Sequence, residues 1–194
     1  DAGEANLTKL GKAVEEAAKA YNVAALALSK ARATTAKGLD KAVNAELAPL
    51  KLERAVFTTQ IDTDANDVGS DGIDRIEFWV QTNPGTRPGP MMKVASGGEL
   101  ARFMLALKVV LADRGSAPTL VFDEIDTGVG GAVADAIGAR LARLSAKVQV
   151  LAVTHAPQVA ARATGHFRIA KGETGKTKRI EARAAAAKLL QAAG

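Results

Sequence analysis

The sequence contains no cysteine, no long uninterrupted apolar segment and no recognisable targeting signal. The lack of cysteine excludes a disulfide framework and thiolate metal sites, which is consistent with a reducing compartment. A membrane-spanning helix needs roughly 18 to 20 consecutive apolar residues, and no stretch approaches that length. The first ten residues, DAGEANLTKL, lack the charged and then apolar layout of a signal peptide. We therefore expect a cytoplasmic protein with no membrane partner.

The composition is that of a globular protein, with 47% hydrophobic and 24% charged residues among 194. This length predicts one ordinary domain with an appendage. The formal net charge of +5 is concentrated near the end of the sequence. There, only Glu173 and Glu181 oppose a group of basic residues: Arg162, Arg168, Lys171, Lys176, Lys178, Arg179, Arg183 and Lys188. Such a segment can bind phosphate backbones, but a solvated surface has the same composition and is the interpretation we favour.

The segment from residue 7 to residue 52 is rich in alanine and other helix formers, with expected breaks only near Gly38 and Pro49. Apolar positions recur at steps of three or four residues: Leu10, Val14, Ala17, Tyr21, Ala24, Leu28 and Ala31. This spacing predicts a helix with one apolar seam, as in a coiled coil. An alanine-rich helix packed on the domain is the alternative. We assign residues 1–50 to a helical coiled-coil arm.

After Pro49 the apolar period changes from helical to two. Residues 55–59 and 76–81 follow this alternation, and the segment between them, DTDANDVGSDG, is crowded with turn-forming residues. We expect two half-buried strands joined as a hairpin. The following NPGTRPGP contains three prolines and is not expected to form regular structure.

Helix and strand patterns alternate in the next part of the sequence. A helix is expected from residue 97 to about residue 113, and short apolar runs at 119–122 and 148–153 have the composition of strands covered on both faces. Four residues predict an amphipathic helix between these strands: Val133, Ile137, Leu141 and Leu144. A strand, a helix and a strand in this order predict a right-handed parallel crossover in an α/β fold.

The last part of the sequence predicts a second hairpin, formed by residues 166–170 and 177–182 around GETG. We assign residues 51–185 to one lobe and residues 186–194 to a tail without an assigned function.

Two adjacent carboxylates, Asp123 and Glu124, follow the apolar run that ends at Phe122. Ligands bind at the carboxyl ends of strands in open α/β sheets. In a nucleotide hydrolase the first carboxylate would hold magnesium, and the second would orient or deprotonate the attacking water. Acids at this position can also be simple helix caps.

The segment Ser96-Gly97-Gly98-Glu99 precedes the helix expected from residue 97. Serine and glutamate three positions apart predict a capping box, in which each side chain satisfies a free backbone donor. The same geometry suits an anion, because the two glycines let a phosphate approach the backbone at a helix N-terminus.

Thr154 and His155 follow the second apolar strand, so the imidazole should emerge beside the two acids at the same sheet edge. A single histidine usually has a structural role. At this edge it could donate a hydrogen bond to a terminal phosphate.

The order of SGGEL, LVFDEID and AVTH resembles the signature, Walker B and switch-histidine segments of ABC-type ATPases. Three longer runs resemble the RecN family of SMC-like DNA-repair ATPases: KVASGGELARFMLALKVVLAD, TLVFDEIDTGVGGAVADAIGARL and VLAVTHAPQVAARA. The resemblance covers Asn83 to Lys171, and the helical segment before it fits the returning arm of the family's coiled coil. It implies an α/β fold, the C-terminal lobe of an ABC-type P-loop NTPase head with an N-terminal coiled-coil helix and an additional β-hairpin.

The resemblance also implies ATP and Mg²⁺ as cofactors. Asp123 would be the magnesium ligand, Glu124 the catalytic base and His155 the sensor of the γ-phosphate. Many ABC proteins have a D-loop aspartate shortly after Walker B, where this sequence has Gly130. The acid nearest that loop is Asp126, to which the resemblance assigns no role.

The signature residues Ser96, Gly97, Gly98 and Glu99 would bind the nucleotide of a second head. The implied partners are therefore a second copy of the head in a homodimer and DNA at double-strand-break ends, in a bacterial, nucleoid-associated setting.

A P-loop should precede these motifs, but no glycine-rich turn followed by Lys-Ser/Thr occurs before Ser96. AKGETGKT at residues 170–177 fits the loosest form of that pattern, yet the β-like TKRIEA follows it in place of a helix, and we do not assign it. The P-loop half of the same protein is therefore a further expected partner. Without it, we expect this chain to be inactive as an ATPase.

Two other functions remain compatible with these motifs. The nucleotide-binding subunit of an ABC transporter would share the signature and Walker B but should lack a helical arm leading into the lobe. A purely structural dimerisation module would be indifferent to the replacement of Glu124.

Overall fold

The computed structural model describes residues 2–112 and 117–167, in two compact units. Within these residues the arm unit comprises 2–41 and 58–79, and the sheet unit comprises 42–57, 80–112 and 117–167. The predicted hairpin at 166–182 lies outside the described residues except for His166 and Phe167, which are in no strand. The predicted tail also lies outside them, as does the basic segment after Arg162.

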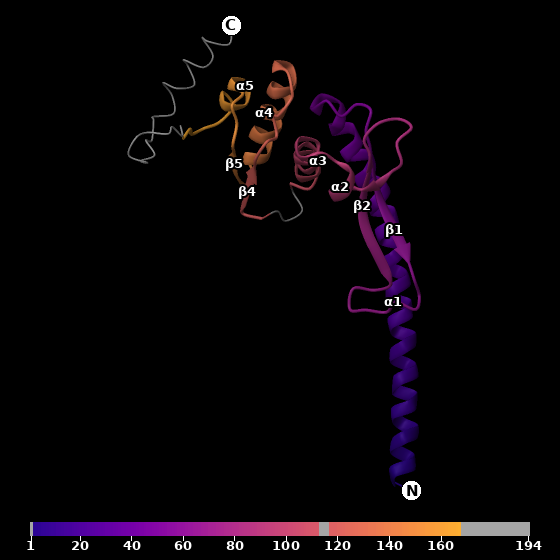
Figure 1. Cartoon of the computed structure of the whole chain (residues 1–194). Helices are drawn as coiled ribbons and strands as arrows, with labels where there is room; N and C mark the ends of the chain where they lie inside the picture. The colour runs from indigo at the N-terminus through magenta and orange to yellow at the C-terminus, as the bar shows by residue number, and fades with distance from the viewer. Residues whose placement is uncertain (1, 113–116, 168–194) are drawn as a thin grey trace, which may run out of the picture. The chain divides into compact units, whose positions relative to one another are not determined.

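Helix α1 (Ala2–Leu47) is continuous over 46 residues (Figure 1). The predicted break at Gly38 is wrong, because one glycine costs only about 1 kcal/mol relative to alanine, which a long helix tolerates. The predicted break at Pro49 is confirmed. The chain tightens there into the 3₁₀ turn η1 (Ala48–Leu50), and Lys51 closes it with a left-handed φ of 59°. No helix in the described part of the chain is long and apolar enough to cross a bilayer.

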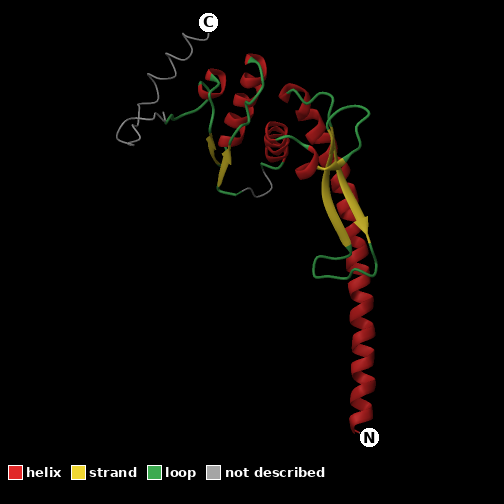
Figure 2. Ribbon diagram, in the orientation of Figure 1, coloured by secondary structure: helices red, strands yellow, loops and turns green. Residues whose placement is uncertain are grey.

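Two strands, β1 (Val56–Thr63) and β2 (Asp74–Gln81), form the predicted hairpin (Figure 2). The Asp64 N–H donates to the Ile73 carbonyl at 3.0 Å, which closes the loop between the strands. A two-residue strand, β3 (Gly89–Pro90), adds to the edge beside β2. The proline-rich segment is therefore not entirely irregular as expected; an edge position tolerates a residue that lacks an N–H donor.

The predicted apolar seam of α1 has two parts. In the first part, Leu10 and Val14 are 59% and 68% exposed. From Tyr21 onward the seam meets the β1–β2 hairpin, because the Tyr21 hydroxyl accepts from the Gly69 N–H at 3.1 Å and donates to the Gly69 carbonyl at 3.0 Å. Leu28, farther along the seam, is still 40% exposed, and the buried alanines of α1 are Ala25 and Ala36, outside the predicted seam.

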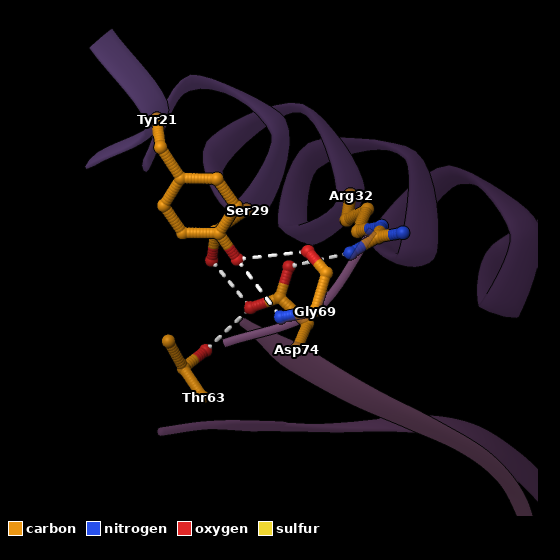
Figure 3. Close-up of polar contacts among 6 residues, drawn as sticks. All are labelled: Tyr21, Ser29, Arg32, Thr63, Gly69 and Asp74. Carbon is orange, nitrogen blue, oxygen red and sulfur yellow. Dashed lines mark hydrogen bonds and ion pairs between the residues drawn. The ribbon is translucent and has the colours of Figure 1, made fainter. Parts of the chain in front are cut away.

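A polar cluster around Asp74 fastens β2 to α1 (Figure 3). The Asp74 carboxylate accepts from the hydroxyls of Ser29 and Thr63, both at 2.8 Å, and pairs with Arg32 at 3.1 Å. Its side chain is fully shielded from solvent. The hydrogen bond from Ser29, followed by those from Thr63 and Arg32 and the charge of Arg32, holds the pKa of Asp74 below its ordinary value.

We expect Asp74→Asn to destabilise the arm unit, because asparagine keeps the shape but loses the charge that pairs with Arg32. The folded pKa lies below the ordinary 3.8, so the stabilisation is complete at neutral pH and is lost as pH falls below 3.8 through the lowered value. Thermal unfolding should therefore separate the wild type from Asp74→Asn at pH 7, and the difference should shrink as the pH falls progressively below 3.8. The matched control is Asp71→Asn, at an exposed position in the loop that precedes β2. An equal fall in melting temperature for both variants would contradict the role of the cluster.

The sheet unit contains the predicted parallel crossover (Figure 2). Strand β4 (Thr119–Phe122) pairs in parallel with β5 (Gln149–Ala152), in the register Phe122↔Ala152, and α4 (Gly131–Ser145) connects them. Three further helices belong to this unit: α2 (Met91–Val94), α3 (Gly97–Val110) and α5 (Pro157–Ala160). The predicted fold class is thereby confirmed.

The core of the sheet unit includes the predicted stripe of α4, with Ile137, Leu141 and Leu144 buried. Phe103 and Leu105 of α3 are also buried, at no more than 1% exposure. Hydrophobic burial of this kind supplies the main stabilising free energy of a domain.

Glu46, near the end of α1, is bonded to two arginines of α4. Arg140 Nε donates to its carboxylate at 2.8 Å and Arg143 Nη2 at 2.7 Å. Burial alone would raise the pKa of Glu46, but the hydrogen bond from Arg143 and the charges of both arginines together lower it. The last turns of α1 are therefore fixed to α4 within the sheet unit.

One face of the β4–β5 sheet is open in the described residues. Val121, Leu151 and Val153 are 67%, 46% and 57% exposed, whereas Phe122 on the opposite face is buried. The prediction that both faces are covered is therefore wrong for this face, because the described residues contribute no second layer over it. Parallel sheets are normally covered on both sides.

Candidate functional site

The carboxyl ends of β4 and β5 meet at one edge of the sheet. The Val153 N–H donates to the Phe122 carbonyl at 2.9 Å, one step beyond the β4–β5 pairing. Asp123 and Glu124 therefore leave the same edge as Thr154 and His155, as the sequence predicted.

Glu124 has an unusual backbone conformation, with a φ of 56°. A left-handed conformation costs a residue other than glycine on the order of 1 kcal/mol, and such positions cluster at functional sites. The Asp123 carboxylate accepts from the Glu124 N–H at 2.9 Å, and the Glu124 carbonyl accepts from the Thr127 N–H at 3.2 Å. This tight turn leaves both carboxylates on the exposed surface.

The start of α3 is capped as predicted. Ser96 is the N-cap, and its N–H and hydroxyl donate to Glu99 Oε2 at 3.0 Å and 2.6 Å, in a capping box. The hydrogen bond from the Ser96 hydroxyl lowers the pKa of Glu99. Both residues are thus engaged in structural hydrogen bonds, and Ser96 could meet a phosphate only if its hydroxyl turned away from Glu99.

Gly97 and Gly98 lie against the turn that carries Glu124. A Cβ added at Gly97 would lie 3.3 Å from Glu124 Oε2, and one added at Gly98 would lie 3.6 Å from the Glu124 carbonyl oxygen. The sequence did not predict this approach within one chain. The Glu124 carboxylate therefore lies where the free amides and the helix dipole of α3 favour negative charge.

Arg102 lies behind these glycines and was not predicted as a site residue. It is 7% exposed, its Nη1 is 3.3 Å from a Cβ added at Gly98, and its Nε and Nη1 have no hydrogen-bond partner. Burial lowers the pKa of Arg102, and the nearby Glu99 opposes this effect. A buried guanidinium with unused donors adds positive charge to the start of α3, which suits an anion.

Asp126 is the second residue that sequence reasoning did not assign. It is 3% exposed and accepts from the Thr154 hydroxyl, and from the Ala156 N–H at 3.1 Å. Its other oxygen is 3.9 Å from His155 Nδ1, while the His155 side chain is 82% exposed. In the sequence Asp126 was visible only as an acid shortly after Asp123 and Glu124. Nothing near it in the sequence indicated that it bonds to Thr154 and Ala156.

The residues present fit a magnesium nucleotide. The described residues contain no group of three or more His, Asp or Glu side chains arranged around a common metal position. Magnesium in nucleotide sites needs only one or two carboxylates, because phosphates and water complete its shell, so Asp123 is a sufficient donor. The amides at the start of α3 fit a phosphate, and the buried Arg102 behind them contributes positive charge without reaching the surface.

The chain is similar in sequence to bacterial DNA repair proteins named RecN. The relative from Rickettsia conorii is 44% identical over 166 residues, which is 86% of this chain and 30% of the relative. The relative from Haemophilus influenzae is 40% identical over 147 residues, which is 76% of this chain and 26% of the relative. The chain thus spans less than a third of the length of either curated relative. No protein-family model matches it.

Solved structures share the fold at low sequence identity. An Smc head domain with an extended coiled coil from Pyrococcus furiosus, bound to the C-terminal domain of ScpA, has a TM-score of 0.65 at 16% identity; the match covers 98% of this chain and 46% of that chain. A structure from work on ATP-driven dimerization and DNA-stimulated activation of SMC ATPases has a TM-score of 0.51 at 17% identity. That match covers 86% of this chain and 98% of the other. The α/β architecture is therefore that of an SMC-type head.

Proposed function

The chain belongs to the RecN family of DNA repair proteins, and we propose that it is the signature-, Walker B- and switch-histidine-bearing C-terminal half of that family's ATPase head. The observation that carries the proposal is the meeting of Asp123–Glu124 and Thr154–His155 at one sheet edge. The start of α3 lies beside the same turn.

A P-loop half supplied by another part of the same protein would complete the head. The open face formed by Val121, Leu151 and Val153 supports this, because a parallel sheet needs cover on both sides.

ATP and Mg²⁺ would supply the phosphoryl group to be transferred and the positive charge that stabilises its transfer. Asp123 would bind the metal, and Glu124 would orient or deprotonate the attacking water. His155, exposed at the same edge, would hydrogen-bond the terminal phosphate.

Ser96, Gly97, Gly98 and Glu99 would act on the nucleotide of a second head. A phosphate bound at the start of α3 would repel the Glu124 carboxylate that lies against Gly97, so Glu124 must turn away when the signature is occupied. Two heads would then enclose two nucleotides and couple this closure to the arm that begins with α1. The closure would serve DNA double-strand-break repair in the bacterial cytoplasm, at the nucleoid.

Helix α1 runs directly into the sheet unit, where Glu46 bonds to Arg140 and Arg143. A transporter nucleotide-binding subunit does not need such an arm, so this feature favours the SMC-like alternative. Arg162, the first residue of the basic segment, pairs with Asp135 at 2.9 Å.

The proposal is tested by mixing this chain with a separately expressed P-loop half and measuring ATP hydrolysis with and without DNA. Neither half alone should turn over, because Asp123 lacks an organised phosphate to meet when the P-loop is missing. The mixture should hydrolyse ATP, and DNA should stimulate it. Persistent inactivity of a complex confirmed by light scattering would favour a structural dimerisation module.

A further inference from the structure

Asp126 is a buried carboxylate that the proposed chemistry does not use. Burying a charge is costly unless hydrogen bonds and opposite charge compensate for it. Among the described residues no lysine or arginine pairs with Asp126, and His155 is its basic neighbour. Its compensation comes instead from the Thr154 hydroxyl and the Ala156 N–H.

These two donors flank His155 on both sides in the sequence. The Ala156 N–H is shared between Asp126 Oδ2 at 3.1 Å and the Thr154 hydroxyl oxygen at 3.0 Å, and the Thr154 hydroxyl donates to the same Asp126 oxygen. One carboxylate therefore holds the Thr154 side chain before His155 and the backbone N–H after it. His155 itself needs no buried contact to be held in place, which is consistent with its exposed side chain.

Asp126 also belongs to the turn that carries the two exposed acids. Its carbonyl accepts from the Val129 N–H at 3.4 Å, and the Glu124 carbonyl accepts from the Thr127 N–H. The backbone bond from Val153 to Phe122 is one step past the β4–β5 pairing. Past this backbone bond, the contacts of Asp126 join the turn that carries Asp123 and Glu124 to the turn that carries His155.

We propose that Asp126 and Thr154 form a positioning clip that sets His155 relative to Asp123 and Glu124. The clip rests on the proposed function, because it matters for turnover only if His155 acts on the nucleotide. Its geometry can be tested without that function. Displacing a reacting group by about 1 Å can lower the rate on the order of a hundredfold. The benefit of holding His155 in place can therefore offset the free-energy cost of burying the Asp126 carboxylate.

The first test follows the Ala156 amide in the chain alone, by hydrogen exchange and NMR. In the wild type this amide should be protected, and Asp126→Asn and Thr154→Val should each speed its exchange. Thr119→Val is the matched control, because the Thr119 hydroxyl donates to Gln149 at 2.8 Å between the same two strands at their other end. Unchanged exchange of the Ala156 amide in both clip variants would overturn the clip.

The second test measures ATP turnover of the complex with the P-loop half. Thr154→Val should lower kcat by about tenfold with little change in KM, Thr154→Ser should restore kcat, and Thr119→Val should leave it unchanged. In a His155→Ala background, Thr154→Val should have no further effect. An equal additional loss in that background would overturn the positioning role and indicate a merely structural one.

The two tests separate the failure of the clip from the failure of the proposed function. If His155→Ala leaves turnover at the wild-type level, the proposed role of His155 fails, and the positioning role of the clip fails with it, even if the Ala156 amide shows that the contacts exist. If His155→Ala lowers turnover and Thr154→Val does not, only the clip is refuted.

Discussion

Replacing Glu124 by glutamine should lower ATP turnover of the reconstituted head by roughly a hundredfold or more. Glutamine has nearly the same shape but cannot accept a proton from water. ATP binding should remain, because Asp123 and the start of α3 are unchanged. Equilibrium binding of ATP and single-turnover hydrolysis measured on the same preparation separate the two effects.

The matched control for this prediction is Glu53→Gln, at an exposed glutamate of the same unit that precedes β1. Its turnover should equal that of the wild type. Wild-type turnover in Glu124→Gln as well would show that Glu124 is not the base, and the left-handed turn would then need another explanation.

Replacing Gly138 by valine should lower the free energy of unfolding by about 3 kcal/mol. Gly138 is buried in α4 where α5 crosses it, and a Cβ there would lie 3.1 Å from the Gln158 carbonyl oxygen and 3.2 Å from the Val159 Cα. Both are backbone atoms, so α5 must move as a whole. Denaturant unfolding followed by circular dichroism measures the loss.

Replacing each of two helical glycines, Gly38 and Gly138, by alanine gives an internal comparison. Gly38→Ala in α1 should stabilise the chain by about 1 kcal/mol, since nothing lies within 4 Å of the added Cβ and alanine is the better helix former. Gly138→Ala should be destabilising despite that gain. If both variants become more stable, α5 yields more easily than its contacts indicate.

Local patterns predicted the elements that depend on local physics. The alternation in β1 and β2 and the apolar runs of β4 and β5 indicated strands, and the stripe of α4 also indicated which face of that helix is buried. The capping box was predictable because Ser96 and Glu99 satisfy each other within one turn. The common edge of the acids and His155 followed from parallel crossover topology.

Contacts between distant residues were not predictable from such patterns. The approach of Gly97 to Glu124 joins residues 27 positions apart, and nothing in either motif indicates the other. The burial of Asp126 depends on Thr154, which lies beyond α4. Gly38 was mistaken for a break because helix formation is cooperative over the whole of α1, whereas a single residue contributes little.

The open sheet face was mispredicted for a related reason. The apolar composition of 119–122 and 148–153 does indicate strands made to be covered on both sides. It cannot indicate whether the covering layer belongs to the same stretch of sequence. Val121, Leu151 and Val153 therefore look like core residues in the sequence and are exposed in the described structure.

The left-handed backbone of Glu124 has a consequence for the engineering of this protein. Glycine adopts that conformation without strain, so Glu124→Gly would relieve the turn while removing the proposed base. A screen that selects variants for thermal tolerance alone would therefore enrich inactive proteins at this position, an instance of the trade-off between robustness and activity. A search for more thermostable variants of this head should therefore keep Glu124 and introduce stabilising substitutions at other positions.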